Sequence, residues 1–263
     1  MKGTVKVGIT LVIVILLMLG LTSLAFAWST GYLGVSNYAQ CGYEDRAGRQ
    51  YVTNLHNEIK SWTSNSYIKT DNNAWAKHMI VSQSGGDGTA DSVNFFAWSG
   101  HGLTTTNYQT AHPNSANGTL LNHGTYGELI SDYNARTFEI EWGPDKMRWA
   151  TMYTCRFGSW SNTTKQNYYK KMFKGLRLFM AFDTVMYLDS REGTEYGKRL
   201  TNGQYIRTAF VDAAKIYQKN HGFTVKTAVG GWNSAWNDTR YSSTSRAPNW
   251  SDSSFTRQVT TVS

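Results

Sequence analysis

Two segments carry the most informative patterns of the chain: VNFFAWSGHG at residues 93–102 and WATMYTC at residues 149–155. Each begins with a short run of apolar, β-branched and aromatic residues, which is typical of a buried strand. Each run then leads to a side chain that can take part in catalysis, His101 in the first and Cys155 in the second. Because ligands bind at the carboxyl ends of strands in an open α/β sheet, we expect both side chains at one sheet edge.

The rest of the chain alternates between strand and helix patterns. This alternation predicts an α/β fold with a mostly parallel sheet and helices on both faces. Further strands are predicted at residues 32–38, 176–182 and 225–229. Helical spacing of apolar residues is present at 44–62, 75–82, 167–174 and 206–218.

The sequence predicts three parts along the chain. Residues 1–27 carry two lysines, an apolar run and the small-residue pattern Ala25-Phe26-Ala27, so we expect a secretory signal cleaved after Ala27. The alternative is an uncleaved anchor, because the apolar run is about long enough to cross a bilayer. Residues 28–236 are expected to form one α/β domain. Residues 237–263 are rich in Ser, Thr, Asn and Trp without a clear period, which predicts irregular structure.

A histidine beside a cysteine is the minimum apparatus of a cysteine hydrolase. A thiol with a pKa of about 8.5 is mostly protonated at neutral pH, so His101 would take the proton of Cys155 before the sulfur attacks a carbonyl carbon. The main-chain N–H groups of Gly102 and Cys155 are predicted to stabilise the resulting oxyanion. Both residues follow strand ends, where we expect amides that the strand ladder no longer uses.

A strand that ends in Ser-Gly-His-Gly at residues 99–102, followed by a second strand that ends in Cys155, resembles the catalytic dyad of the caspase, gingipain and legumain superfamily (clan CD). The resemblance covers roughly residues 31–231 and is sharp only at the two strand ends. It implies a caspase-like three-layer sandwich, a peptide or protein substrate, and a His101–Cys155 dyad that needs neither a third acid nor a cofactor. Residues 95–182 are also similar to a family of secreted prokaryotic proteins, from which no activity carries over.

Two charged residues are candidates for a substrate pocket. Asp183 follows the strand predicted at 176–182 and would select Lys or Arg. Arg156 follows the cysteine and would select Asp or lower the pKa of the Cys155 thiol. The alternative for each is an ordinary salt bridge at the sheet edge.

A disulfide is the main alternative to catalysis. The chain has two cysteines, Cys41 and Cys155, and an even count in a secreted protein favours a bridge. Cys41 comes just after the first predicted strand, so it is also expected near the carboxyl edge. A bridge would abolish the nucleophile and make the protein an inactive binding protein. The sequence leaves both hypotheses open.

The aromatic residues suggest a second kind of function. Trp232, Trp236 and Trp250 lie in a polar region and would offer stacking platforms for carbohydrate or the cell envelope. Packing in a core is the alternative for each of them.

Other classes of function lack support in the sequence. The formal net charge is +8, but the basic residues are scattered apart from Lys170, Lys171 and Lys174, so nucleic-acid binding is not expected. His112 and His123 lie in the long segment 103–134 without the spacing of metal ligands, and we predict no metal site. After signal cleavage no membrane association is expected.

The amino-terminal prediction is tested by mass spectrometry of protein released by its native host. We expect a mature chain that begins at or within a few residues of Trp28. Recovery of the intact chain from the membrane fraction alone would instead identify an anchored protein.

Overall fold

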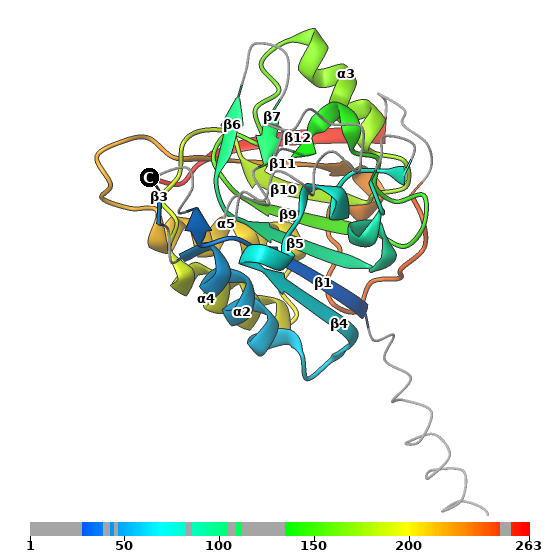
Figure 1. Cartoon of the computed structure of the whole chain (residues 1–263), viewed down its shortest axis with the longest axis horizontal. Coiled ribbons are helices and arrows are strands. Elements are labelled where there is room, and N and C mark those ends of the chain that lie inside the picture. The colour runs from blue at the N-terminus through cyan, green and yellow to red at the C-terminus, as the bar shows by residue number, and fades with distance from the viewer. Residues whose placement is uncertain are drawn as a thin grey trace, which may run out of the picture.

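The computed structural model describes residues 28–38, 43–44, 47–82, 86–104, 109–111, 135–247 and 254–263. Its centre is a seven-stranded sheet with the order β12-β11-β10-β9-β5-β1-β4 (Figure 1). The strands are β1 Trp28–Gly34, β4 Thr63–Thr70, β5 Phe95–Ser99, β9 Trp149–Tyr153, β10 Leu178–Phe182, β11 Lys226–Trp232 and β12 Phe255–Thr261.

The sheet is mostly parallel. Neighbouring strands from β4 through β1, β5 and β9 to β10 run in one direction, and β11 and β12 add two antiparallel pairings. Every residue of β5, β9 and β10 is buried, as expected for central strands that are covered on both faces. The sequence prediction of a mostly parallel α/β sheet is therefore confirmed.

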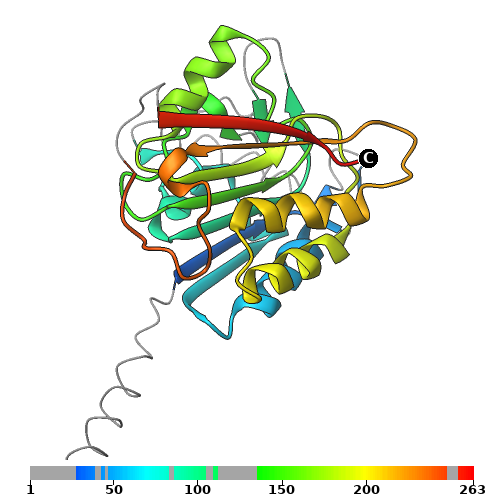
Figure 2. The same ribbon diagram turned by 180° about the vertical axis from the view of Figure 1, so that it is seen from behind.

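Helices and loops cover the sheet on both faces and form a three-layer sandwich. One face carries α2 (Ala47–Ile59), α4 (Ser190–Thr201) and α5 (Ile206–Tyr217). Figure 2 shows these helices with the molecule turned by 180°. The other face carries α3 (Thr163–Met172) and short 3-10 turns. Aromatic residues fill the core between the layers. The indole rings of Trp28 and Trp149, for example, stack with centroids 4.0 Å apart.

Helix α4 was not predicted, because its sequence SREGTEYGKRLT contains two glycines and few apolar residues. The glycines have a packing role. A Cβ atom on Gly193 would lie 2.3 Å from the carbonyl oxygen of Tyr51, and one on Gly197 would lie 2.5 Å from Cβ of Glu58. Close contact between α4 and α2 therefore requires glycine at both positions, although each lowers helix propensity by about 1 kcal/mol.

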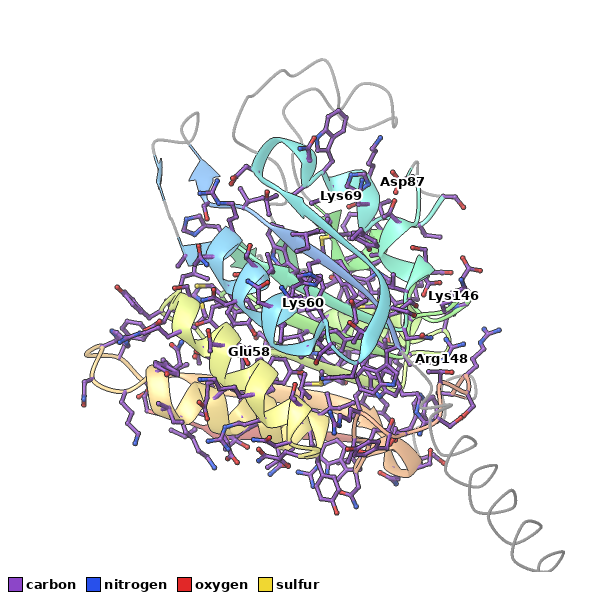
Figure 3. All side chains as sticks on the ribbon, turned by 90° about the horizontal axis from the view of Figure 1, so that it is seen from below. Glu58, Lys60, Lys69, Asp87, Lys146 and Arg148 are labelled. Carbon is purple, nitrogen blue, oxygen red and sulfur yellow. The ribbon has the colours of Figure 1, made fainter. Side chains whose placement is uncertain are left out.

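Two edge strands were also missed. β4 has the largely polar sequence TSNSYIKT, and its Lys69 (Figure 3) is typical of edge strands, where charge discourages pairing with other chains. β12 pairs with β11 along its whole length, from Phe255 opposite Trp232 to Thr261 opposite Lys226. The prediction of irregular structure for 237–263 is therefore wrong for residues 255–261.

Smaller differences concern the boundaries. The first strand begins at Trp28 rather than at residue 32, and the helix predicted at 75–82 is only a 3-10 turn at Ala76–His78. Two short strands, β2 (Asn37–Tyr38) and β3 (Tyr43–Glu44), follow β1. Among the described residues no helix is long and apolar enough to cross a membrane. The predicted signal segment, residues 1–27, lies outside the part of the chain that the structure describes.

A buried carboxylate joins the carboxyl-terminal segment to the amino ends of two strands. Asp238 is 4 % exposed, accepts a hydrogen bond from Nε1 of Trp149 at 2.9 Å, and binds Arg177 through two bonds of 2.7 and 2.9 Å. Nearby, the guanidinium of Arg148 (Figure 3) donates to the Thr244 carbonyl at 2.7 Å. The predicted domain boundary at residue 236 is therefore wrong, because Asp238 belongs to the core.

Loss of this carboxylate should destabilise the fold. Asp238→Asn leaves the guanidinium of Arg177 without its charged partner, and we expect the free energy of unfolding to fall by about 3 kcal/mol. Asp212→Asn is the matched control, because Asp212 pairs with Arg199 and Lys215 at the surface and should cost about 1 kcal/mol or less. Urea unfolding measures both, and equal losses would contradict the role given to Asp238.

Candidate active site

The two candidate catalytic residues follow neighbouring strands that pair in register. In the parallel pair of β5 and β9, Ser99 lies opposite Tyr153, and the Gly100 amide donates to the Tyr153 carbonyl at 3.3 Å. His101 comes two residues after Ser99, and Cys155 two residues after Tyr153. The predicted placement at the carboxyl ends of adjacent parallel strands is confirmed.

The sulfur of Cys155 lies against the backbone of Met186. The Met186 N–H donates to Sγ at 3.5 Å, and Sγ is 3.6 Å from the Met186 carbonyl oxygen. An amide that donates to sulfur stabilises the thiolate, and the carbonyl accepts from the protonated thiol. Met186 is almost fully buried in the segment between β10 and α4. No local pattern signals this contact, because it joins residues 31 positions apart in the chain.

The backbone reverses immediately after the cysteine. Arg156 has a left-handed conformation with φ of 57°, and its N–H donates to the Thr184 carbonyl at 2.9 Å. Left-handed backbone at a residue other than glycine costs about 1 kcal/mol or more, and such residues cluster at active sites. The turn therefore directs the chain away from Cys155 and sets Arg156 beside the β10–α4 segment.

Two pockets flank this point. The larger, about 810 Å³, is termed the α2–α4 pocket and is lined by Ser36, Arg49, Asp71, Tyr187, Asp189 and Arg191, among others. The smaller, about 450 Å³, is termed the Arg156 pocket and is lined by Arg156, Lys165, Asp183, Val185 and Phe223, among others. Residues 183–185 line the Arg156 pocket and 187–191 line the α2–α4 pocket. Met186, whose backbone contacts the Cys155 sulfur, is the residue of this segment that separates the two linings along the chain.

Both residues predicted for a substrate pocket, Asp183 and Arg156, line the Arg156 pocket. Asp183 also forms the salt bridge that was the alternative for it, because its Oδ1 is 2.7 Å from the Arg257 guanidinium on β12. No ion pair with a described residue is found for the Arg156 side chain, which is exposed.

Helix α2 begins at the carboxyl ends of two strands. A Cβ atom on Gly48 would lie 2.2 Å from the Val35 carbonyl oxygen and 3.1 Å from that of Ser99. Glycine is therefore needed for this approach, and the first residues of α2 line the α2–α4 pocket. The first residues of α4 line the same pocket, so two helix amino termini with their partial positive charge meet there.

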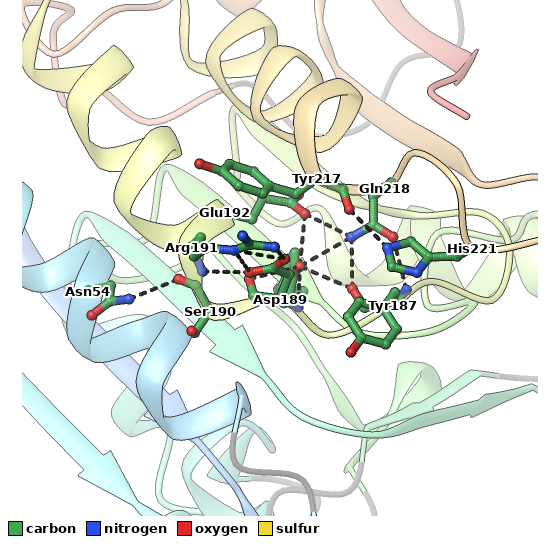
Figure 4. Close-up of polar contacts among 10 residues, drawn as sticks. Asn54, Tyr187, Asp189, Ser190, Arg191, Glu192, Tyr217, Gln218 and His221 are labelled. Atoms are coloured by element: carbon green, nitrogen blue, oxygen red, sulfur yellow. Dashed lines mark hydrogen bonds and ion pairs between the residues drawn. The ribbon is translucent and has the colours of Figure 1, made fainter.

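A buried polar network fixes the β10–α4 segment (Figure 4). The Tyr153 hydroxyl donates to Oε2 of Glu192 at 2.8 Å and accepts from the Asp189 amide at 3.1 Å. The Gln218 amide donates to the same Glu192 oxygen at 2.8 Å and to the Tyr187 carbonyl at 2.7 Å. The network therefore holds both ends of residues 187–189, directly after Met186.

Burial raises the pKa of Glu192 from 4.5 to about 8, although its bonds from Gln218 and Tyr153 act in the opposite direction. The carboxyl is therefore mostly protonated at neutral pH. Tyr51 stacks on Tyr153 with ring centroids 3.8 Å apart, so the network lies under an aromatic layer that excludes water.

Gly102, predicted to contribute to an oxyanion hole, lies at the start of a second, small sheet. Gly102 does not follow the end of a ladder, because it begins β6 (Gly102–Thr104), which pairs with β7 (Gln109–Ala111), itself paired with β8 (Ala135–Arg136). The place of its amide in an oxyanion hole stays a prediction. His112, His123 and Cys41 lie outside the described residues.

The tryptophans proposed as carbohydrate platforms differ in their positions. Trp232 is 1 % exposed and donates from Nε1 to the Leu176 carbonyl at 3.0 Å, so it is a core residue. Trp236 is partly buried, with the Arg207 guanidinium 5.0 Å from its ring, and Trp250 lies outside the described residues. Within the described chain no three His, Cys, Asp or Glu side chains are grouped as metal ligands would be.

The sequence of this chain matches a known protein family over most of its length. Residues 27–259 match the family described as "Domain of unknown function (DUF6345)". The chain belongs to this family. The match contains the strand ends that carry His101 and Cys155, the β10–α4 segment and most of β12. No curated protein matches the sequence.

The protonated state of Glu192 predicts how stability depends on pH. Between about pH 4.5 and 8 the folded protein keeps the Glu192 proton that the unfolded chain releases. The stabilisation is thus complete below pH 4.5 and is lost as the pH rises through 8. Compared with Glu192→Gln, which does not titrate, wild-type unfolding free energy should decline by about 2–5 kcal/mol across this range.

Urea unfolding at several pH values measures this difference. Glu195→Gln is the control, because Glu195 lies on the same helix but pairs with Arg199 near the surface, and it should retain the wild-type slope. Parallel pH profiles for wild type and Glu192→Gln would show that Glu192 does not hold its proton.

Proposed function

We propose that the protein is a secreted cysteine hydrolase that acts on peptides or proteins through a dyad of His101 and Cys155. The observation that carries the proposal is the register of β5 and β9, which brings the two residues to neighbouring strand ends. The Met186 amide at the sulfur, the left-handed turn at Arg156 and the flanking pockets give further support. The resemblance to clan CD peptidases agrees with this assignment.

The reaction would use groups already described. His101 takes the proton of the Cys155 thiol, and the thiolate attacks the carbonyl carbon of the scissile bond. The negative charge on the carbonyl oxygen is stabilised by a main-chain N–H, for which that of Cys155 is the candidate. The amine leaves with the proton from His101, and water, deprotonated by His101, then hydrolyses the thioester. The sequence of steps requires neither a metal nor a cofactor.

The competing hypothesis is an inactive binding protein with a Cys41–Cys155 disulfide. Its support is the even cysteine count in a chain that we expect to be exported. The carbohydrate-binding form of this hypothesis loses Trp232, which is a core residue. The two hypotheses predict opposite chemistry at Cys155.

Alkylation of native protein separates them. Iodoacetamide without reductant should modify Cys155 faster than it modifies glutathione, because a histidine partner raises the thiolate fraction. His101→Ala should slow the reaction severalfold, and Cys155→Ala should abolish peptidase activity while the fold is retained. Cys41→Ala should leave activity largely unchanged. Peptide mass spectrometry locates the label.

The disulfide hypothesis expects the reverse pattern. Cys155 would resist the label until a reductant is added, and a Cys41–Cys155 linked peptide would be found in a non-reducing digest. Either cysteine substitution would then lower thermal stability to a similar extent, because the loss of a bridge across so long a loop costs about 3–5 kcal/mol. That result would overturn the proposed activity.

A further inference from the structure

One peptide group links Cys155 to the end of helix α5. It is the peptide between Met186 and Tyr187, which is trans, so its carbonyl and its N–H point in opposite directions. The Met186 carbonyl oxygen is 3.6 Å from Sγ of Cys155, and the Tyr187 N–H donates to Oε1 of Gln218 at 2.9 Å. The cysteine and the glutamine therefore contact opposite sides of the same rigid group.

Gln218 holds this peptide from a fixed position (Figure 4). It is fully buried at the carboxyl end of α5, where its own N–H donates to the Ala214 carbonyl at 2.8 Å. Its Nε2 donates to the Tyr187 carbonyl at 2.7 Å, so the side-chain amide binds both main-chain groups of Tyr187. The amide has one orientation here, because turning it over would place Nε2 against the Tyr187 N–H.

The orientation of this peptide matters for the sulfur. A carbonyl oxygen accepts a hydrogen bond from a thiol but repels a thiolate, so the Met186 carbonyl favours the protonated form of Cys155. The Met186 N–H belongs to the preceding peptide and has the opposite effect, because it donates to the sulfur. Gln218 therefore holds directly the group that opposes ionisation, and it holds the Met186 N–H only through the chain.

We propose that Gln218 is a positioning residue for Cys155, which keeps the Met186 carbonyl at the sulfur and so restrains thiolate formation before substrate binds. A turn of the Met186–Tyr187 peptide would release this restraint. The Tyr187 side chain is half exposed and lines the α2–α4 pocket, so a ligand there could cause the turn. The regulation of catalysis rests on the proposed function. The link from Gln218 to the sulfur does not.

The pH dependence of alkylation tests this link without any need for activity. The protein is first reduced, so that Cys155 is free under either hypothesis about Cys41, and iodoacetamide labelling is followed by peptide mass spectrometry. Gln218→Met removes the acceptor of the Tyr187 N–H at similar side-chain volume. About one unit below the wild-type thiol pKa, Cys155 should then react about three- to tenfold faster, as loss of one hydrogen bond to the thiol predicts.

The shape of the profile separates this effect from damage to the structure. A loosened segment would expose the sulfur and raise the rate at every pH. Loss of the carbonyl shifts the profile toward lower pH and should change the rate of the fully ionised thiol by less than about twofold. The same rate increase at every pH would therefore overturn the inference.

Two further variants test the acceptor itself. Gln218→Asn is too short to hold the Tyr187 N–H and should shift the profile in the same direction as Gln218→Met. Gln218→Glu keeps an oxygen that accepts from this N–H, and it should react no faster than wild type. Equal profiles in wild type, Gln218→Met and Gln218→Asn would overturn the inference.

Tyr153→Phe is the control within the same network. It removes the hydroxyl that binds Glu192 and Asp189 but leaves the bond from Tyr187 to Gln218, so it should lower stability and keep the wild-type profile. Gln204→Met makes the same side-chain change at a residue that pairs with Asp212, and it should also keep the profile. A shift in Tyr153→Phe as large as that in Gln218→Met would refute the specific role of Gln218.

The ionisable groups nearby are controlled separately. Glu192 titrates in the same range, with a pKa raised to about 8, so each comparison is repeated in the Glu192→Gln background, where the shift should persist. Arg156, Asp183 and Asp189 on the adjoining segments, and the proposed partner His101, are the same in every variant. A shift that vanishes in the Glu192→Gln background would assign it to Glu192 and overturn the inference.

Cleavage of a pool of fluorogenic peptides separates failure of this inference from failure of the proposed function. If both hold, the acidic limb of kcat/KM in Gln218→Met should move to lower pH together with the alkylation profile. A shifted alkylation profile without cleavage by any protein would support the role of Gln218 and refute the hydrolase. Cleavage that requires Cys155, with equal alkylation profiles in wild type and Gln218→Met, would overturn the inference and leave the hydrolase in place.

Discussion

The parallel pairing of β5 with β9 is the constraint on which the site depends. It places Ser99 opposite Tyr153, so the residues two positions later, His101 and Cys155, leave the sheet at the same edge. Side chains alternate between the faces of a strand, so a slip of one residue would turn every buried side chain of β9 to the opposite face. Because both faces pack against large apolar clusters, the core enforces the same register that the candidate site needs.

The segment between β10 and α4 adds what the two strands cannot supply. Met186 offers its amide to the sulfur, and the residues on either side of it line separate pockets. The segment is held by hydrogen bonds to Glu192, a buried carboxyl whose pKa is raised to about 8. A neutral buried network avoids most of the desolvation cost of a charge and still fixes the backbone in one place. Tyr153 joins this network to β9, two residues before Cys155.

Much of the fold could be predicted because its central elements carry strong local patterns. β5, β9 and β10 are continuous apolar runs, and α2 and α5 show clear helical spacing. The missed elements lack such patterns, since β4 and β12 are polar edge strands. Helix α4 contains two glycines that are needed because α2 packs closely against it. A local sequence pattern gives no information about this packing between helices that are distant in the chain.

The candidate site also has one part that local sequence patterns predict and one part that they do not. The positions of His101 and Cys155 follow from where two strands end, and the apolar runs in the sequence predict these ends. The Met186 amide, the Asp183–Arg257 ion pair and the Glu192 network join residues 26 to 74 positions apart, so only the folded chain brings them together. The choice between Asp183 and Arg156 as the selective residue was likewise open in the sequence. The ion pair of Asp183 with Arg257 on β12 was the alternative that the sequence left open for Asp183.

The proposed dyad is tested by the pKa of the Cys155 thiol, measured from the pH dependence of its alkylation with peptide-level mass spectrometry. A dyad with His101 and an amide donor from Met186 predicts a pKa well below the usual value of about 8.5, and a return toward that value in His101→Ala. A pKa at or above 8.5 that is the same in both proteins would show that His101 does not activate Cys155. The proposed His101–Cys155 dyad would then be wrong.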